Sequence, residues 1–540
     1  MRESQDIRTF EEWLANKGGS LNKDIVVTST PDRGLSVFAL EPIPESTILS
    51  TVPKAALLSV RNGSMADVLE HEKIGGGPGL IAAVLHEQQK GTASEWWGYL
   101  QSFPSRVYVP AFWSPEELKW LQGTSLVDRL AADRLDLQDD FDSIIKPLAK
   151  AHPDLLDPAK TTFEAFCKAA TFVSSRAFGV DDYHGMSLVP VADIFNHKAA
   201  VVELSSDYAI EPVCFGDGDD SSDSEGGGTN SQSPAADNDG SGAEEANSGS
   251  RDASSNPGSP AEASDNQESD SEEEGCRPSK RPRITRGALL KPGQQADPSL
   301  RLEMAICGND IDGEEVLEIV AASALGKCQE IHNTYGEYGN SELVYKYGFA
   351  LCHNPFDSVV VDKQLLLNAA RSQLGLQACA ARCAFLEEFS DLLEDDEELF
   401  EVLPGGVINA PLAVALRVLT ASNEQFATWS TLEDALARGP PGNEAEAAAD
   451  KQPANLDLAC KGPEAVTPAM RTALSVTLQR CLARYSWRAT AAEHEKVQEK
   501  LRNGAADASR LEHHSARAAS IQLVLGEQKI LDEALAALCS

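Results

Sequence analysis

Residues 333–340 read NTYGEYGN, and the triplet YGF follows at residues 347–349. Two earlier segments are as distinctive: RGLSVFA at residues 33–39 and LVPVADIFNH at residues 188–197. The overall composition of the chain names no function, and any one of these segments alone would be weak evidence. Together, in this order and with these flanking residues, the three segments are a specific signal.

The pattern around these segments predicts a β-rich module followed by helices. Apolar, β-branched runs broken by turns predict strands at residues 25–27, 35–39 and 47–50, after a short helix near residues 10–14. Residues 80–175 have a more helical pattern, and from residue 362 onward the pattern is helical almost throughout. We therefore expect a β-rich catalytic-type module with a helical inset, and then a helical domain.

In this order the three segments closely resemble the signatures of SET-domain methyltransferases, in the branch of the Rubisco large-subunit and ribosomal-protein lysine methyltransferases. The amino-acid sequence at residues 333–336 and 347–349 is similar to the corresponding motifs of the subfamily of SET domain-containing protein 6. The resemblance covers most of residues 8–355. It continues more weakly at residues 412–419 and 527–531, which look like the Rubisco-methyltransferase substrate-binding domain.

The resemblance implies an α+β protein with a β-rich SET fold and a helical inset, followed by an all-α C-terminal domain. The expected boundaries are residues 1–215 for the first part of the SET domain, 216–300 for an acidic insertion, 301–355 for the closing part, and 356–540 for the helical domain with a loose linker near 438–462.

The resemblance also implies a reaction, the transfer of a methyl group from S-adenosyl-L-methionine (SAM) to a lysine amine of a protein substrate. A free lysine has a pKa near ~10.4, so the site must favour the neutral amine. An apolar channel and the positive sulfonium of SAM both disfavour the ammonium form. Such an enzyme needs no strong base, but it must position the amine and exclude water.

Tyr335 matches the tyrosine that positions the amine in this family, because a phenol hydroxyl forms hydrogen bonds without ionising near pH 7. Tyr347 and Phe349 match aromatic residues that shape the lysine channel and the SAM pocket, and aromatic walls tolerate a cationic sulfonium. For Tyr335 the alternative is an aromatic residue at a strand end whose hydroxyl has a purely structural partner.

Asn196 and His197 match the pair that holds the cofactor in this family: the asparagine side chain at the amino-acid end, and the backbone around the histidine at the adenine. Asp193 precedes them in the same segment, and its presence favours this assignment over a histidine buried in the core. Further predicted cofactor-binding residues lie in a turn whose backbone approaches SAM, where a glycine allows close contact: Arg33, Gly34, Leu35 and Ser36.

Arg176 matches a residue that lines the carboxylate of SAM and the target channel, where a guanidinium would form a charge-assisted pair. A surface salt bridge is the alternative for this arginine. Trp96 fits a family pattern near the substrate, and Tyr347 and Arg176 are also predicted to contact substrate. A tryptophan of the hydrophobic core is the alternative for Trp96.

The chain of 540 residues has a formal net charge of −38, which argues against direct, non-specific binding to nucleic acid. No apolar run approaches the roughly 18–20 residues of a membrane span, and the acidic N-terminus does not look like a signal or transit peptide. The 11 cysteines are scattered, so we expect reduced thiols in an intracellular protein and no metal site.

The insertion predicted at residues 216–300 contains no Phe, Trp or Tyr, so burial cannot offset the entropy of ordering it. Between residues 217 and 275 it has 17 acidic residues and one basic residue, a net charge of −16. A basic patch around Lys280, Arg281 and Arg283 follows. This patch predicts an import receptor as a partner and the nucleus as the main location, with the cytoplasm as a second one; a simple charge patch is the alternative.

Two other functions remain open at this point. A SET scaffold that has lost catalysis would act as a protein-binding module, although Asn196, His197 and Tyr335 are all present. Methyl transfer to another side chain, such as histidine, is the second alternative, but relatives with that activity tend to alter the YGF ending that residues 347–349 retain. Only Cys352 lies shortly after Phe349, so the zinc-bound cysteine cluster of histone-type SET enzymes is not expected.

Overall fold

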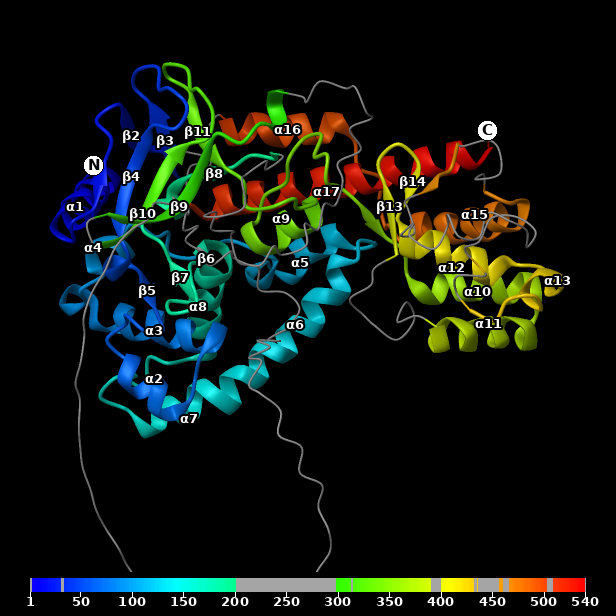
Figure 1. Ribbon diagram of the computed structural model, residues 1–540, viewed down its shortest axis with the longest axis horizontal. Helices are drawn as coiled ribbons and strands as arrows, with labels where there is room; N and C mark the ends of the chain where they lie inside the picture. The colour runs from blue at the N-terminus through cyan, green and yellow to red at the C-terminus, as the bar shows by residue number, and fades with distance from the viewer. Residues whose placement is uncertain are drawn as a thin grey trace, which may run out of the picture. The chain divides into compact units, whose positions relative to one another are not determined.

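Figure 1 shows the computed structural model of the chain, which describes residues 2–30, 34–200, 298–311, 314–389, 400–431, 435, 456–459, 466–502 and 508–539. Several sequence predictions lie outside these residues: those for Arg33, for the insertion up to residue 297 with Lys280, Arg281 and Arg283, and for most of the linker. Residues 298–300 form a short 3₁₀ turn.

Three small sheets form the β-rich part of the protein (Figure 1). The first, in the order β1-β4-β10-β9, consists of Ser20–Leu21, Ile48–Pro53, Glu314–Ala321 and Met304–Ile311. The second, in the order β2-β3-β11-β8, consists of Ile25–Thr30, Gly34–Ala39, Glu330–Asn333 and Asn196–His197. The third, β5-β7-β6, consists of Leu58–Ser59, Met186–Leu188 and Ala177–Gly179. Strands from both sides of the insertion pair with each other, so both halves form one module.

The strand alternation that predicted β2 and β3 is visible in their burial. Ile25 and Val27 of β2 are buried, whereas Val26 between them is exposed. Val37 of β3, opposite Val27 in the antiparallel pair, is fully buried. Alternate side chains of a strand point to opposite faces, so this sheet has one face toward the hydrophobic core.

Helices of the N-terminal half form the predicted inset beside these sheets. The bounds are Arg2–Asn16 for α1, Ala66–Glu72 for α2, Gly76–Lys90 for α3, Trp97–Leu100 for α4, Pro115–Leu118 for α5, Leu126–Asp140 for α6, Lys146–Ala151 for α7 and Phe163–Arg176 for α8. The hydroxyl of Thr162 caps α8 by accepting a hydrogen bond from the backbone of Ala165. The helix ends where Ala177 becomes extended and starts β6, which places Arg176 at the boundary of helix and sheet.

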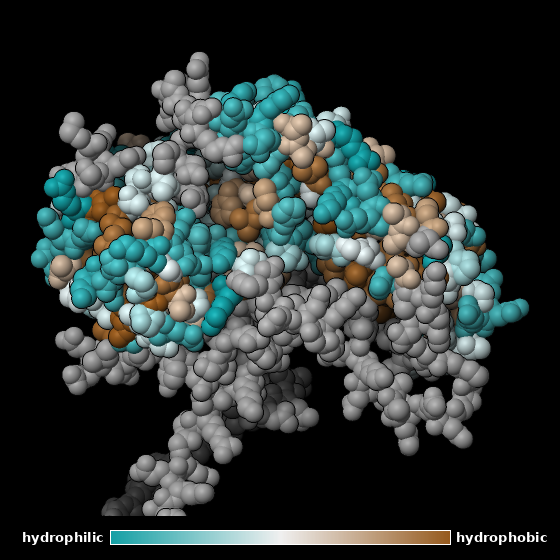
Figure 2. Space-filling view, turned by 90° about the horizontal axis from the view of Figure 1, so that it is seen from above, coloured by the Kyte–Doolittle hydropathy of each residue, from teal (hydrophilic) through white to brown (hydrophobic). Residues whose placement is uncertain are grey.

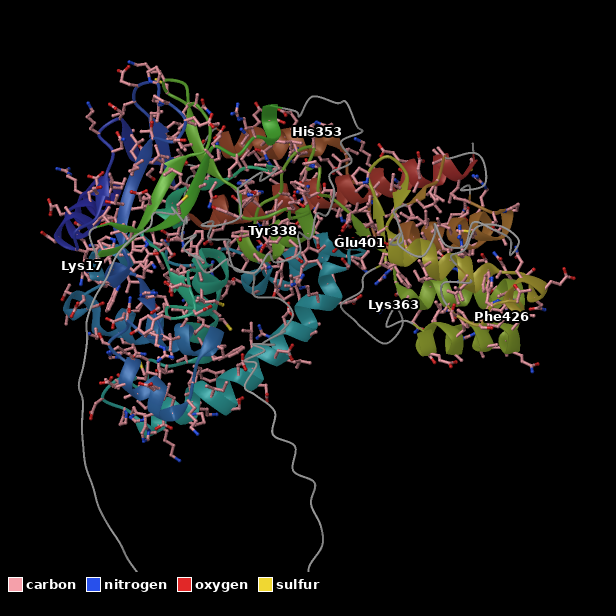
Figure 3. All side chains as sticks on the ribbon, in the orientation of Figure 1. Lys17, Tyr338, His353, Lys363, Glu401 and Phe426 are labelled. Carbon is pink, nitrogen blue, oxygen red and sulfur yellow. The ribbon has the colours of Figure 1, made fainter. Side chains whose placement is uncertain are left out.

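The C-terminal part is mainly helical, as predicted. Its helices are Asn340–Tyr347 for α9, Lys363–Leu374 for α10, Leu376–Phe389 for α11, Ala410–Thr420 for α12, Asn423–Phe426 for α13, Pro468–Ala483 for α15, Ala491–Arg502 for α16 and Ala508–Cys539 for α17. The long helix α17 contacts α15 and α16 and also α9, the helix that follows the third sequence segment. Figure 3 labels Tyr338 close to α9 and Phe426 in α13, where the Phe426 ring packs edge-on against Phe385.

The prediction of an all-α C-terminal domain is incomplete, because this part also contains a four-stranded sheet. Its strands, in the order β12-β13-β14-β15, are Val359–Val360, Glu401–Leu403, Val407–Ile408 and Leu456–Asp457. Strand β15 falls inside the segment expected to be a linker, and Leu458 beside it is fully buried. Strands of two or three residues are too short to show a period in the sequence.

Figure 2 shows hydrophilic side chains over much of the face in view, with apolar residues in separate patches. Among the described residues, no helix is long and apolar enough to cross a membrane.

Candidate functional site

The second and third sequence segments meet along one pair of strands. β8 runs parallel to β11, with Asn196 opposite His332 and His197 opposite Asn333. The chain continues from the end of β11 directly to Tyr335. This pairing brings together predicted site residues that the whole insertion separates in the sequence.

Four aromatic rings form the centre of the site. Between ring centroids, Tyr335 lies 4.5 Å from Tyr347 and 5.0 Å from His197. Phe349 lies 6.0 Å from both His197 and Tyr347. These separations are within the range of favourable contacts between aromatic side chains. The structure therefore groups these four predicted residues into one aromatic cluster.

Gly348 lies between two of these aromatic residues, Tyr347 and Phe349, at the end of α9. It ends α9 with φ +78°, a left-handed conformation that glycine adopts without strain. A Cβ atom at this position would lie 2.5 Å from the carbonyl oxygen of Tyr108. A larger residue between Tyr347 and Phe349 would therefore force the backbone to move.

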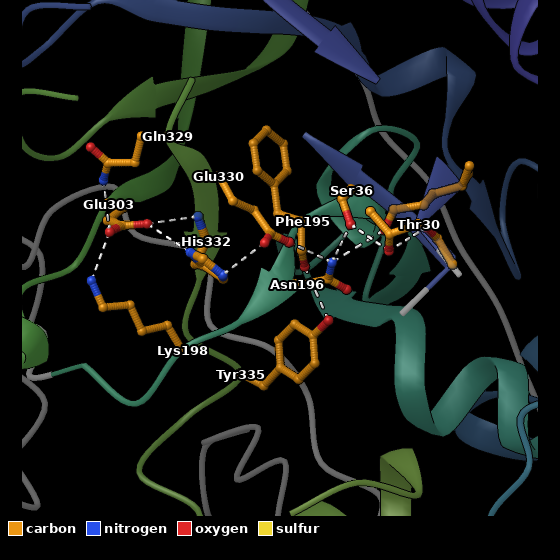
Figure 4. Close-up of polar contacts among 12 residues, drawn as sticks. Thr30, Ser36, Phe195, Asn196, Lys198, Glu303, Gln329, Glu330, His332 and Tyr335 are labelled. Atoms are coloured by element: carbon orange, nitrogen blue, oxygen red, sulfur yellow. Dashed lines mark hydrogen bonds and ion pairs between the residues drawn. The ribbon is translucent and has the colours of Figure 1, made fainter. Parts of the chain in front are cut away.

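The hydroxyl of Tyr335 is held inside this cluster as a neutral phenol. It donates a hydrogen bond to the carbonyl oxygen of Phe195 over 3.0 Å (Figure 4). Burial raises the pKa of Tyr335 above its ordinary value of 10.0. The hydroxyl is fixed but remains able to accept a further hydrogen bond, as the positioning role predicted for it requires.

His197 is neutral and has a defined tautomer. Burial, with a smaller contribution from His332, lowers the pKa of His197 to about 3. The backbone N–H of Tyr335 donates to Nδ1 of His197 over 3.0 Å, so the ring proton resides on Nε2. Nε2 is buried and has no hydrogen-bond partner among the described residues. The ring thus offers one unused donor.

The side-chain amide of Asn196 connects the second segment to the first. Its Nδ2 atom donates to Ser36 Oγ over 2.8 Å, to Glu330 Oε1 over 2.9 Å and to the carbonyl oxygen of Leu35 over 3.3 Å (Figure 4). No described residue donates to Asn196 Oδ1. The predicted residues of strands β3 and β8 are therefore in direct contact.

Strand β3 begins at Gly34, which has φ +74°. No atom lies within 4 Å of the position that a Cβ atom would occupy there. The start of β3 is thus open on this side of Gly34, and the predicted approach of a ligand to its backbone stays a prediction. Arg33, the preceding residue of the prediction, lies outside the described residues.

Arg176 is partly buried beside the site and is held from two directions. Its Nη1 atom lies 3.0 Å from both the carboxylate Oδ2 and the backbone carbonyl oxygen of Asp193. Its guanidinium carbon lies 4.8 Å from the ring centroid of Phe103, a cation–π contact. Its Nε atom is buried and has no partner among the described residues. The surface salt bridge considered for Arg176 is therefore excluded.

Asp193 is buried beside the site, where one of its carboxylate oxygens binds Arg176 and the other has no partner among the described residues, so its predicted contact with the cofactor stays a prediction. Only 1% of that side chain is exposed. Its Oδ2 atom accepts hydrogen bonds from Arg176 and from the Tyr99 hydroxyl, each over 3.0 Å. Burial raises the pKa of Asp193, and the positive charge of Arg176 opposes that shift. The carboxylate acts on the site through Arg176.

Trp96 lies in the hydrophobic core, which is the alternative considered for it. The residue is 4% exposed, and its indole N–H donates to the carbonyl oxygen of Ala56 over 3.1 Å. It belongs to the large core cluster that includes Trp13 and Tyr99. The ring contacts found among the described residues do not join Trp96 to His197, Tyr335, Tyr347 or Phe349.

Glu330, His332 and Tyr99 contact predicted site residues but were not identified from the sequence. Glu330 and His332 alternate along β11, so the period of a strand would have placed them on one face. The pairing of β11 with β8 is needed to see that this face includes Asn196. No periodic pattern in the sequence relates Tyr99 to the site, because its hydrogen-bond partner Asp193 is distant in sequence.

Among the residues that the structure describes, no group of three or more His, Cys, Asp or Glu residues is placed to hold a metal ion. The described cysteines are free thiols.

Comparison with solved structures defines the class of fold. A crystal structure of the SET domain of LSMT bound to lysine and AdoHcy aligns with a TM-score of 0.56 and 16% identity, over 99% of this chain and 91% of that chain. Rubisco LSMT bound to AdoMet aligns with a TM-score of 0.54 and 15% identity, with the same coverage. The protein therefore has the SET fold with the helical C-terminal part of this class, which confirms the predicted fold.

Sequence comparison points to a particular kind of relative. N-lysine methyltransferase SETD6 of Rattus norvegicus is 30% identical over 238 residues, which are 40% of this chain and 50% of that protein. The Homo sapiens protein of the same name is 31% identical over 182 residues, 31% of this chain and 38% of that protein. The chain spans about half the length of the curated relatives it matches, and no family model matches it. The resemblance to SET domain-containing protein 6 that the sequence indicated is confirmed.

Proposed function

We propose that this protein is a SAM-dependent protein-lysine N-methyltransferase. The observation that supports this function most directly is the placement of the Tyr335 hydroxyl inside the aromatic cluster, next to the strand of Asn196 and His197. Similarity to enzymes named N-lysine methyltransferase supports the same activity. A lysine of a protein substrate is the acceptor.

The residues of the site fit the groups of SAM. Asn196 Oδ1 is an acceptor for the ammonium group of its amino-acid end, and the Arg176 guanidinium attracts its carboxylate. The unused Nε2–H of His197 is a buried donor, and the rings of Tyr335 and Tyr347 form a wall that suits a sulfonium. When bound, SAM supplies an electrophilic methyl group.

The chain's own residues then prepare the lysine amine. The aromatic cluster of His197, Tyr335, Tyr347 and Phe349 disfavours a charged ammonium, because a charge loses hydration in an apolar environment. The Tyr335 hydroxyl, fixed by Phe195, orients the amine by a hydrogen bond. The proton of the lysine leaves to solvent, since both His197 and Tyr335 remain neutral.

The experiment that tests this activity uses SAM with a labelled methyl group. The full chain is incubated with labelled SAM and a fractionated cell lysate, and labelled residues are mapped by mass spectrometry. Label on lysine, absent in a parallel reaction with Tyr335→Phe, supports the proposal. Label on histidine would show methyl transfer to another side chain, and binding of SAM without any labelling would favour the scaffold.

We also infer that the protein acts in the nucleus. The support is the basic patch of Lys280, Arg281 and Arg283, which resembles an import signal that an import receptor would bind. Replacing these three residues by alanine should shift a fluorescent fusion of the full chain from the nucleus to the cytoplasm. Unchanged nuclear accumulation would contradict this location signal.

A further inference from the structure

The amide of Asn196 has only one possible orientation. Two of its three partners, the carbonyl oxygen of Leu35 and the carboxylate of Glu330, only accept hydrogen bonds. If the amide were rotated by half a turn, its oxygen would face both of these acceptors. The NH₂ group must therefore point to Glu330, and Oδ1 points away from it as an acceptor without a described partner.

Glu330 lies at the end of a row of ionisable residues, next to His332, Glu303 and Lys198 (Figure 4). The Nε2 atom of His332 lies 3.6 Å from Glu330 Oε2, and its Nδ1 atom lies 2.9 Å from Glu303 Oε2. Lys198 lies 2.6 Å from the other oxygen of Glu303. Hydrogen bonds from His332 and Lys198 lower the pKa of Glu303 to about 2 although burial opposes the shift. The row approaches Glu330 at Oε2, whereas Asn196 contacts Oε1.

The geometry points to Glu330 as a positioning residue for the cofactor. We propose that Glu330 locks the Asn196 amide so that its Oδ1 atom accepts a hydrogen bond from the α-ammonium group of the bound cofactor. His332 and Glu303 hold Glu330 in turn. This inference rests on the proposed function, because it assumes that SAM occupies the site next to Asn196.

The proposal gives a specific thermodynamic expectation. A hydrogen bond between a neutral amide and an ammonium group is charge-assisted, and its loss corresponds to about a tenfold change in affinity or more. The effect requires a ligand with the amino-acid end. The loss of affinity on replacing Glu330 does not require the sulfonium charge of the ligand. Replacing Glu330 should have no further effect in a variant in which Asn196 has already been replaced by alanine.

Isothermal titration calorimetry of the full chain with three ligands tests these points: SAM, S-adenosylhomocysteine without the sulfonium charge, and methylthioadenosine without the amino-acid end. Glu330→Ala should weaken SAM and S-adenosylhomocysteine by about tenfold and leave methylthioadenosine unchanged. Glu330→Gln, which retains an acceptor oxygen for Asn196, should recover part of the loss. The double variant Asn196→Ala/Glu330→Ala should bind S-adenosylhomocysteine as Asn196→Ala alone does.

Glu87→Ala is the matched control, because Glu87 is a fully buried carboxylate that accepts hydrogen bonds from Ser64 and Ser94 outside the site. It should lower the melting temperature without changing the preference for S-adenosylhomocysteine over methylthioadenosine. Equal weakening of all three ligands by Glu330→Ala, weakening of SAM alone, or additive losses in the double variant would overturn the proposal. A wild-type chain that binds none of the ligands would instead contradict the proposed function.

Discussion

Tyr335 and His197 stay uncharged for a common physical reason. Both side chains lie in an aromatic cluster, where ionisation would cost hydration, so the pKa of the phenol rises and that of the imidazole falls. The backbone of Tyr335 donates to His197, while its hydroxyl donates to Phe195. One residue thus fixes the histidine tautomer and presents a hydroxyl to the site.

Tyr335→Phe should retain the fold and the affinity for SAM and lower turnover by roughly 10²-fold or more, the scale for the loss of one aligned polar group. The aromatic ring and its contacts with Tyr347 remain, and only the hydroxyl and its bond to Phe195 are lost. Steady-state kinetics, calorimetry with SAM and thermal unfolding check the three parts of this expectation. A variant with more than half of the wild-type rate would show that the hydroxyl is only structural.

The sequence alone predicted the site residues whose identity is unusual, such as the Asn196–His197 pair and Tyr335. It did not predict that Asp193 would be buried behind Arg176, or that Glu330 would contact Asn196. Both relationships depend on which strands and helices are neighbours. Residue type shows which chemistry is available, whereas these contacts depend on tertiary packing.

At the level of elements, two neighbouring residues of α17, Gly526 and Glu527, make contacts that join this helix to other parts of the chain. Gly526 faces Asp357, which lies in the segment after α9. Asp357 accepts hydrogen bonds from the backbone and side chain of Asn340, the first residue of α9, and burial raises its pKa to about 6. Gly526 of α17 lies against Asp357, where a Cβ atom would be 3.1 Å from Oδ2. Glu527, the next residue, accepts a hydrogen bond from the Tyr485 hydroxyl over 2.6 Å.

Glu527→Gln should make the protein more resistant to alkaline pH. Burial, with a smaller contribution from Asp357, raises the pKa of Glu527 from 4.5 to about 8. The folded state therefore holds this proton more tightly than the unfolded state, and stability falls as pH rises from 4.5 through about 8. Glutamine retains an acceptor for Tyr485 and removes the titration, so the variant should melt above the wild type at pH 9.

Thermal unfolding between pH 5 and pH 9 measures this difference. Asp532→Asn, at a half-exposed carboxylate on the same helix, controls for a new amide in α17. A Glu527→Gln variant whose melting temperature differs from the wild type by the same amount at pH 5 and pH 9 would contradict the expectation.

Element prediction succeeded where the periodic pattern was long. Strands β2 and β3 alternate buried and more exposed residues and lie where the sequence indicated, and α15 and α17 lie in the part of the chain expected to be helical. β12–β15 were missed, because each has only two or three residues and is defined by its neighbours. The helical pattern expected from residue 362 onward is interrupted at Gly375, between α10 and α11, and again by strand β13.

At the level of the whole molecule, the two flanks of the insertion are held together. Lys198 forms an ion pair with Glu303, and Ala200 packs in a small apolar cluster with Leu302 and Ala305. These contacts bring the described residues on the two sides of the insertion close together. The length of chain between them therefore has little influence on the position of the strands.

Deletion of residues 217–275 should leave the melting temperature and basal methylation nearly unchanged. The segment removed has no aromatic residue, and the entropy of loop closure changes only slowly with loop length. Thermal unfolding and KM at two salt concentrations check this. A large fall in melting temperature would contradict the expectation, and a higher KM with a weaker salt dependence would show that the acidic segment attracts a basic substrate.

The paired flanks of the insertion also mean that covalent continuity between them is dispensable. A protease cleavage site introduced within residues 217–275 would divide the chain into two polypeptides, each contributing strands to the same sheets: β4 pairs with β10, and β3 and β8 with β11. After cleavage, the two fragments should co-elute in size-exclusion chromatography and retain SAM binding, and they should separate only in denaturant. The protein is thus a candidate for a split protein, whose two fragments could be expressed separately and then reassembled.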